Sequence, residues 1–253
     1  DGKGVEVVLV RDLDMGSHNI TLSTSFESIS NCTFNGNNHT IANYTLSNKQ
    51  YAGLLPNAIR VTVKNLTLKN ANITAVNDGS NNAYAGGFIG RAYGTNVVEN
   101  CTLENSIVQG INKVGGIAGF QAENGISIRK CTVKGSTIKV DTENQEYGQC
   151  GGILGYIGSV AAANEVSGNF IINTKVEAPA NTNIGEEHRK SSICVGTLQG
   201  VKGQSLVIDM PFSYIQSSTF NGKTIDKTEY MGLLGGIRYE ETQPSLTING
   251  TRF

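Results

Sequence analysis

The residues best suited to acid–base chemistry in this chain are carboxylates, and two of them lie close together near its start. Asp12 and Asp14 are two residues apart, so a strand through this segment would place both side chains on one face. Hydrolysis of a glycosidic bond uses two carboxyl groups about 5–10 Å apart. Neither aspartate has an equivalent later in the chain, however, so we predict solvated carboxylates and no catalytic residue.

A second acidic segment could supply oxygen ligands to a cation. Asp141, Glu143 and Glu146 lie within six residues of one another, and Ca²⁺ is bound by carboxylate and carbonyl oxygens. The segment lacks the glycine and the ligand spacing of an EF-hand loop. We therefore expect a solvated loop with weak Ca²⁺ binding as its one candidate metal function, and we expect no other cofactor.

Histidine and cysteine offer little nucleophilic chemistry. His18, His39 and His188 have no sequence neighbours that would complete a Ser-His-Asp or Cys-His arrangement. The chain has five cysteines and no C-x-x-C pair, which disfavours a complete disulfide framework and a zinc site. A single disulfide between neighbouring repeats and a metal site remain as alternatives to buried free thiols.

A repeat becomes visible when the surrounding sequence is considered. The strings GGFIG, GGIAG and GGILG occur at residues 86–90, 115–119 and 151–155. With looser copies the anchors are Gly53, Gly86, Gly115, Gly151, Val195 and Gly232, at spacings of 33, 29, 36, 44 and 37 residues. Periods of 20–50 residues are typical of solenoids, propellers and arrays. Strands follow the glycines rather than a helix N-terminus, so a phosphate-binding loop is disfavoured.

Each repeat unit has the pattern of three short strands separated by glycine or asparagine corners. Residues 126–133 alternate between apolar and polar side chains, as expected of a strand with one buried face. We therefore predict an all-β fold, a right-handed parallel β-helix of about six or seven coils, with a propeller as the rival. Corner positions where only glycine fits are predicted at Gly53, Gly86, Gly87, Gly115, Gly116, Gly151, Gly152 and Gly232.

The β-helix prediction assigns roles to other residues that recur. Cys32, Cys101 and Cys131 share one position of the unit, and we expect them to form a ladder of small buried side chains with Leu66 and Leu246 on the same rung. Tyr51 and Tyr84 lead adjacent units. Stacked tyrosines could offer a platform to a sugar ring, or could cover the corner as a structural stack, which we favour.

Long loops of a solenoid often carry its binding function. The longest interval between anchors contains a run of charged residues, and we identify it as a candidate surface for binding. The run comprises Glu186, Glu187, His188 and Arg189.

Charge and hydropathy limit the choice of partners. The net charge is −1, from 20 basic and 21 acidic residues, so we expect no nucleic-acid binding. No apolar run approaches the roughly 20 residues needed to cross a bilayer, so we expect no membrane-spanning segment in this chain.

The repeat resembles the GLUG family of bacterial surface proteins, whose units read roughly GGLVG…ISNC. VEVVLVRDLDMG at 5–16 resembles the family strand that ends in DIDL. CTFNGNNHTIANYTLSN at 32–48 resembles its FDGNGHTIKNLTI segment, and YAGLL at 51–55 resembles its AGLFG entry. Asp12 matches the family's recurring acid, which implies a structural role for it. The units drift after residue 160.

From this resemblance we expect a single β-helix domain over 1–253, with capping coils at 1–48, regular repeats at 49–178, and degraded repeats with a C-terminal cap at 179–253. It implies a bacterial cell-surface or extracellular location, to which a lipid anchor on a removed N-terminal segment would be one route. The expected function is non-enzymatic: an adhesin-like module or rigid spacer that presents loops to an extracellular glycan or a host or cell-surface protein. The alternatives are a carbohydrate-active β-helix enzyme (polysaccharide lyase or glycoside hydrolase) and an accessory domain of a larger surface protease.

Overall fold

The computed structural model describes most of the chain as β-strands joined by short corners. The described residues are 4–16, 19–22, 28–77, 79, 82–141, 148–158, 163–178, 191–200, 205–209, 214–216, 218–220, 223–225, 234–239 and 245–249. Within these ranges no helix occurs. The strands form four sheets, here named A to D.

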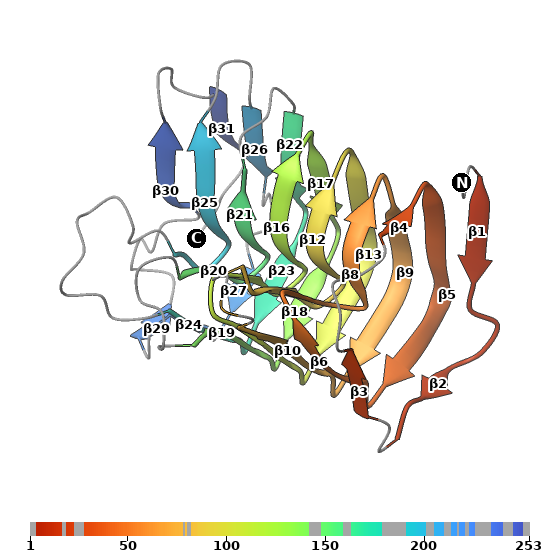
Figure 1. The fold of residues 1–253 in the computed structure, drawn as a ribbon. Coiled ribbons are helices and arrows are strands. Elements are labelled where there is room, and N and C mark those ends of the chain that lie inside the picture. Colours follow the sequence, from red (N-terminus) through yellow and green to blue (C-terminus); the bar gives the residue numbers. More distant parts are fainter. Residues whose placement is uncertain are drawn as a thin grey trace.

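Sheet A is the largest sheet and follows the whole length of the molecule (Figure 1). Its main path consists of β1 (Val5–Val8), β5 (Cys32–Ala42), β9 (Thr62–Lys69), β13 (Asn96–Glu104), β17 (Ile126–Arg129), β22 (Ala163–Ser167), β26 (Ser205–Asp209) and β31 (Ser245–Asn249). Its shorter strands are β2 (Leu13–Asp14), β18 (Thr132–Lys134), β23 (Phe170–Ile172) and β27 (Tyr214–Gln216).

The other three sheets complete the cross-section of each coil. Sheet B contains β3 (Asn19–Leu22), β6 (Thr45–Lys49), β10 (Asn72–Val76), β14 (Ile107–Gly110), β19 (Thr137–Val140), β24 (Lys175–Glu177), β28 (Ser218–Phe220) and β29 (Lys223–Ile225). Sheet D contains β7 (Tyr51–Ala52), β11 (Tyr84–Gly86), β15 (Lys113–Gly115) and β20 (Gln149–Gly151). Sheet C contains β4 (Ile29–Ser30), β8 (Leu55–Ile59), β12 (Ile89–Tyr93), β16 (Ala118–Glu123), β21 (Leu154–Ile157), β25 (Val195–Gly200) and β30 (Leu234–Tyr239).

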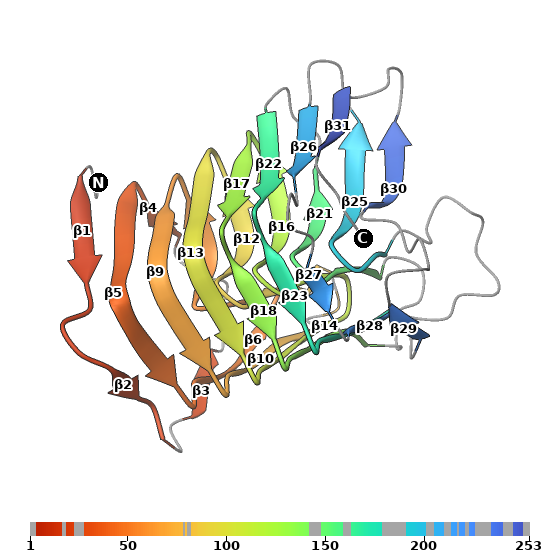
Figure 2. The same cartoon turned by 180° about the vertical axis from the view of Figure 1, so that it is seen from behind.

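The chain is a parallel β-helix. In the regular part it runs from sheet A to B, D and C and then returns to A one layer higher, as in the order β5, β6, β7, β8, β9. Neighbouring strands pair in parallel, and the antiparallel pair of β28 and β29 is the exception within the described residues. The described strands make seven passes, and β31 begins an eighth. Figures 1 and 2 show these layers stacked from β1 at one end to β30 and β31 at the other.

The glycine strings mark the place where sheets D and C approach each other. A Cβ atom on Gly86 would lie 2.1 Å from the carbonyl oxygen of Ile89 and 2.6 Å from the backbone nitrogen of Gly119. A Cβ atom on Gly87 would lie 2.4 Å from the oxygen of Gly116, and 3.1 Å from the side chain of Leu103 in sheet A. Glycine is therefore required for close backbone approach. The turn between the two sheets reaches the apolar core.

The register confirms the alignment of the regular anchors and corrects a later one. Gly86 pairs with Gly115, and Gly115 pairs with Gly151. Gly151 then forms a bridge with Ser192, whereas Val195 pairs with Leu154. The anchor expected at Val195 is thus three residues too late, since Ser192 occupies the place next to Gly151. Gly232 lies outside the described residues.

Asparagine supplies many of the corners. Asn65 and Asn100 have φ values of 52° to 54°, the left-handed region that asparagine tolerates better than most residues. Their side chains also bond along the stack, since Asn100 Nδ2 donates to Asn65 Oδ1 at 2.8 Å. A second column does the same, with Asn70 Nδ2 donating to Asn43 Oδ1 at 3.3 Å. Each corner therefore combines a backbone preference with a bond to the next coil.

The cysteine ladder is shorter than the sequence predicts. Cys101 pairs with Leu66. Cys131 occupies the equivalent position in the next coil, because residues on either side of it pair with Glu99 and Thr102. Cys101 and Cys131 are buried. Cys32 does not belong to this column, because it pairs with Val5 at the start of β5. Leu246 is also off the column, since it pairs with Leu206.

All five cysteines are free thiols. Burial raises the pKa of Cys131 and Cys150, and it raises the pKa of Cys194 to about 12. These thiols therefore stay protonated at neutral pH, which suits a packing role rather than nucleophilic attack.

Candidate functional site

A column of aromatic rings, partly buried and partly exposed, runs along sheets D and C. Tyr51 pairs directly with Tyr84, and their ring centroids lie 5.4 Å apart at an interplanar angle of 22°. Phe120 and Tyr156, from sheet C, continue the column. Tyr84 meets Phe120 edge to face at 4.9 Å, and Phe120 meets Tyr156 at 5.5 Å. Four successive coils thus each contribute one ring.

Two cations, Lys113 and Arg91, lie against the rings of the column. Lys113 Nζ lies 4.6 Å from the ring centre of Tyr84 and 4.9 Å from the ring centres of both Phe120 and Tyr156. Lys113 lies in β15 of sheet D, at the position of the next coil that aligns with Tyr84. Such cation–π contacts stabilise a partly exposed site by about 0.5–2 kcal/mol each. Lys113 therefore joins the upper rings of the column into one packed unit.

The exposure of the rings separates packing from potential binding. Tyr84 is 6% exposed and Tyr156 is 4% exposed, whereas Tyr51 and Phe120 are half-buried. The Tyr84 hydroxyl donates to Asn82 Oδ1 at 2.6 Å, and burial raises its pKa to about 12. The Tyr84 ring is therefore not available as a platform for a sugar, because neighbouring coils cover it. Tyr51 retains an accessible part of its side chain.

Arg91 connects the lower end of the column to a second tyrosine. Its guanidinium carbon lies 5.5 Å from the ring centre of Tyr51 and 5.6 Å from that of Tyr93. A hydrogen bond with Glu123 raises the pKa of Tyr93. Arg60 extends from the preceding coil, where its Nε donates to Asn31 Oδ1 at 2.7 Å. No local sequence pattern predicts this cluster, because it depends on the register between coils.

The carboxylates near the start of the chain are structural. Asp12 Oδ1 accepts the backbone N–H of Thr40 at 2.9 Å and lies 3.1 Å from Nδ1 of His39. These bonds, the backbone bond first, lower the pKa of Asp12. No sequence neighbour of His39 is a persuasive partner, and the structure supplies Asp12. The pair could orient an imidazole, yet Asp12 holds the first coil against β5 through the same oxygen.

Asp14, in β2, also has a structural role. It accepts Asn43 Nδ2 at 2.8 Å and the N–H of Gly16 at 2.8 Å. Both bonds lower its pKa, with that of Asn43 the larger. The two aspartates are therefore occupied in joining the first coil to the second, which agrees with a structural role for this segment.

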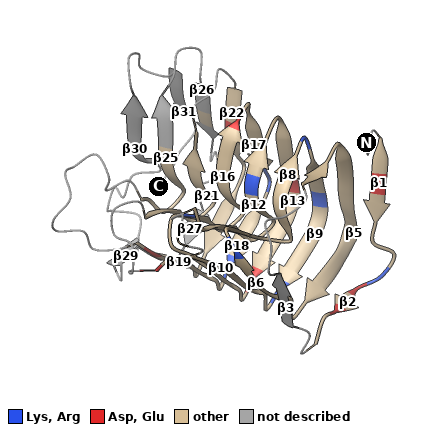
Figure 3. Ribbon diagram, viewed as in Figure 1, with Lys and Arg blue, Asp and Glu red and all other residues tan. Residues whose placement is uncertain are grey.

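Carboxylates on sheet A alternate with cations rather than meeting one another. Glu104 lies between Lys69 at 3.8 Å and Lys134 at 3.3 Å, one coil below and one above. Glu99 pairs with Arg129 at 3.1 Å. Figure 3 shows acidic and basic residues dispersed along the ribbon. Across the described ranges, no three His, Cys, Asp or Glu residues are grouped as a metal site would require.

The expected Ca²⁺ loop is only partly described. Asp141 accepts a hydrogen bond from Gln109 Nε2 at 3.2 Å, so one of its oxygens is already engaged. Glu143 and Glu146 lie outside the described residues. The charged run Glu186, Glu187, His188 and Arg189 also lies outside them, and both candidates stay predictions.

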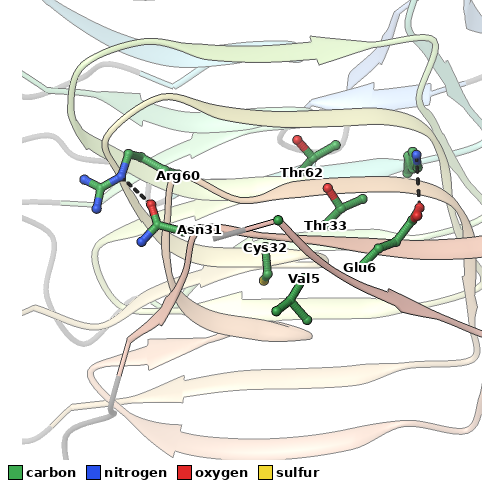
Figure 4. A pocket seen from close by; sticks show the side chains of 9 residues that line it. Val5, Glu6, Asn31, Cys32, Thr33, Arg60 and Thr62 are labelled. Carbon is green, nitrogen blue, oxygen red and sulfur yellow. Dashed lines mark hydrogen bonds and ion pairs between the residues drawn. The ribbon is translucent and has the colours of Figure 1, made fainter. Parts of the chain in front are cut away.

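An open pocket of about 430 Å³ lies near the start of the helix, between β1, β5 and β9 (Figure 4). Glu6 and Lys64 form an ion pair at 3.2 Å at its margin, and Asn35 followed by Lys64 lowers the pKa of Glu6. Burial raises the pKa of the Cys32 thiol. Glu6 and Lys64 are thus paired with each other, Arg60 is hydrogen-bonded to Asn31, and the thiol is not activated. The pocket is lined by Gly4, Val5, Glu6, Asn31, Cys32, Thr33, Arg60, Thr62 and Lys64.

Comparisons with known proteins agree with this architecture. The family model for the GLUG motif matches residues 81–108, which contain β11, β12 and β13. A crystal structure of a Bacteroides ovatus protein, named as a "putative immunoglobulin A1 protease", is similar with a TM-score of 0.53 and 17% identity, over 97% of this chain and 78% of that one. No curated protein matches the chain.

The described residues contain no helix long and apolar enough to cross a membrane.

The matched motif includes Gly86 and Gly87, the residues that permit the close approach of sheets D and C. The chain is therefore a parallel β-helix whose residues 81–108 match the GLUG motif.

Proposed function

We propose that this chain is a non-enzymatic binding module of the bacterial cell surface or extracellular space, adhesin-like in its role, that holds a ligand-contacting surface on a rigid support. The ligand would be an extracellular glycan or a host or cell-surface protein. The observation that carries the proposal is the partly exposed aromatic and cationic column of Tyr51, Arg91 and Phe120 along sheets D and C. Aromatic and arginine side chains are enriched at protein binding sites.

The rigidity of the support follows from the stacked coils. Leu66, Leu68, Leu103 and Val133 are buried in a continuous core, and each coil is hydrogen-bonded to the next throughout the described sheets. In a solenoid, surface residues vary without disturbing such a core. This arrangement suits a protein that presents a surface, and it would serve equally for a rigid spacer.

The organisation of the carboxylates favours binding over hydrolysis. Asp12 and Asp14 are engaged in structural hydrogen bonds, and Glu104 lies between two lysines. A glycoside hydrolase would need two carboxyl groups facing one cleft. A carbohydrate-active enzyme is therefore the weaker alternative for the described part of the chain.

A second candidate function is an accessory domain of a larger surface protease. The structural neighbour carries the name "putative immunoglobulin A1 protease", and the resemblance in fold supports this proposal. An accessory domain would bind a substrate or a surface and leave cleavage to another part of the protein. Incubation of the chain with immunoglobulin A1 tests whether the chain itself cleaves this substrate. An intact heavy chain after incubation is the result expected of an accessory domain.

The main test is a glycan array probed with the purified chain, once with Ca²⁺ and once with chelator, alongside a panel of extracellular host proteins. Reproducible binding to a glycan class or to a host protein is the expected result. Blank results on both supports would contradict the binding proposal and leave the spacer role. Binding that is lost with chelator would point to the segment from Asp141 to Glu146. Release of shortened oligosaccharides from a bound glycan would overturn the non-enzymatic assignment.

A further inference from the structure

The guanidinium of Arg91 lies between two tyrosine rings at the surface. The ring centres of Tyr51 and Tyr93 are 5.5 Å and 5.6 Å from its central carbon, and all three side chains are half-buried. No ion pair joins Arg91 to a carboxylate of the described chain, whereas Arg129 and the lysines of sheet A have such partners. The forked donors of Arg91 are therefore not neutralised by an acidic side chain of the described coils.

The surroundings of this arginine are positively charged. Arg60 is exposed, and both arginines act electrostatically on the Tyr93 phenol. Glu123 is the acidic residue in contact with Tyr93. Two arginines and one glutamate thus act on Tyr93, in a protein whose overall charge is −1.

The backbone fixes the position of the cluster. Arg91 pairs with Asn57 on one side and with Phe120 on the other, so β12 is held between two neighbouring strands. The Tyr51 ring is held by its stack on Tyr84. Side chains that are already ordered lose less conformational entropy on binding. The cluster is therefore preorganised for ligand binding.

From this arrangement we propose that Tyr51, Arg91 and Tyr93, assisted by Arg60, bind a carboxylate-bearing sugar of an acidic glycan. The proposal rests on the binding function above and names its ligand class. A guanidinium presents parallel N–H donors that match both oxygens of a carboxylate. The tyrosine rings offer apolar faces to the C–H groups of a pyranose and hydroxyl groups to its edge. An acidic peptide would need the cations and would make less use of the flanking rings.

The test compares matched pairs of soluble sugars by titration calorimetry. Oligogalacturonate is compared with its methyl ester, and sialyllactose with its methyl ester, so that the members of each pair differ in the charge of the carboxyl group. We expect at least one acidic sugar to bind about tenfold or more tightly than its neutral match, because a hydrogen-bonded ion pair is lost in the neutral one. Preference for oligogalacturonate would identify a uronic-acid polymer, and preference for sialyllactose would identify a sialylated glycan.

Variants then locate the site. Arg91→Gln should weaken binding of the acidic sugar about tenfold or more, and Arg91→Lys should weaken it less, because the charge stays while the fork is lost. Tyr51→Ala should also weaken it. Arg129→Gln, which removes a cation from sheet A, is the matched control and should bind as the original chain does. Circular dichroism and the melting temperature show whether each variant is folded, and Arg91→Lys keeps the site testable if Arg91→Gln is not.

Three results would overturn the proposal. One is equal binding of acidic and neutral sugars; another is unchanged binding by a folded Arg91 variant. The third is binding of dextran sulfate or of an acidic peptide as tight as that of the best acidic sugar, which would indicate charge alone. Glycan or protein binding on the array that is insensitive to Arg91 would refute this site while leaving the proposed function intact, whereas a blank array would refute both.

Discussion

The side chain of Arg91 lies over the ring of Tyr51 in the preceding coil, with 5.5 Å between the guanidinium carbon and the ring centre. The two residues come from different sheets, Tyr51 from D and Arg91 from C, and are 40 positions apart in the chain. They meet because the glycine strings fold sheet C back against sheet D. A surface cluster thus depends on glycines that are themselves buried.

The glycine strings provide the first prediction. Gly86→Ala would place a methyl group 2.1 Å from a backbone oxygen, and we expect it to lower the free energy of unfolding by about 3 kcal/mol, the upper part of the range for overpacked sites. Urea denaturation measures the effect. Gly79→Ala is the control, because its Cβ would meet nothing within 4 Å although its φ is +93°; conformational strain alone should cost about 1–2 kcal/mol there. Equal losses at the two sites would contradict the close-approach explanation.

The asparagine corners provide the second prediction. Asn100 has a φ of 52°, so Asn100→Ala should destabilise the protein by about 1–2 kcal/mol, with the lost bond to Asn65 adding to this. Asn100→Gly should cost less, because glycine adopts this conformation without a steric penalty. Thermal or urea unfolding of the two variants gives the comparison. A glycine variant less stable than the alanine variant would show that the left-handed backbone is not the reason for asparagine here.

The first coil should make stability depend on pH. The pKa values of Asp12 and Asp14 are lowered from the ordinary value of 3.8. Their contribution is therefore fully present above that value and is lost as the pH falls through the lower folded-state values. We expect the melting temperature to drop below about pH 4, and to drop less in the double variant Asp12→Asn, Asp14→Asn. Parallel pH dependence in both proteins would show that other groups control acid unfolding.

The cysteines should differ in reactivity. Cys101, Cys131, Cys150 and Cys194 are buried, whereas Cys32 is half-buried near the open pocket. Iodoacetamide should therefore modify Cys32 first in the native protein, and the other four only after unfolding. Mass spectrometry of digested samples identifies the modified residue, with Cys32→Ser as the control that should remain unlabelled. Early modification of Cys131 in the native state would contradict the buried ladder.

The sequence by itself determined the repeating architecture. Glycine strings that align Gly86, Gly115 and Gly151, together with alternating strands between them, predict stacked coils because both patterns are local. Tyr51 and Tyr84 begin their strands at equivalent positions, so their stacking could also be predicted. These features need only the assumption that each unit lies directly above the previous one.

The exact register required the tertiary structure. Cys32 shares the local pattern of Cys101, yet it lies at the start of β5, where it pairs with Val5. The column of Cys101 and Leu66 continues to His39 in β5, after a register shift that follows Asn35. Val195 resembles an anchor, although Ser192 occupies that place. A local pattern counts residues along one strand, and it does not record where extra residues are accommodated between coils.

The candidate site also belongs to the tertiary structure. The sequence indicated Tyr51 and Tyr84 as a pair, but only their packing shows that Tyr84 is covered and that Tyr51 is not. Arg91, Tyr93 and Phe120 have no distinguishing local pattern. Their contacts with the column depend on the distance between two sheets, which the buried glycine backbones set. Local side-chain patterns thus determined which strands form and stack, while the close approach of those strands decided which side chains meet at the surface.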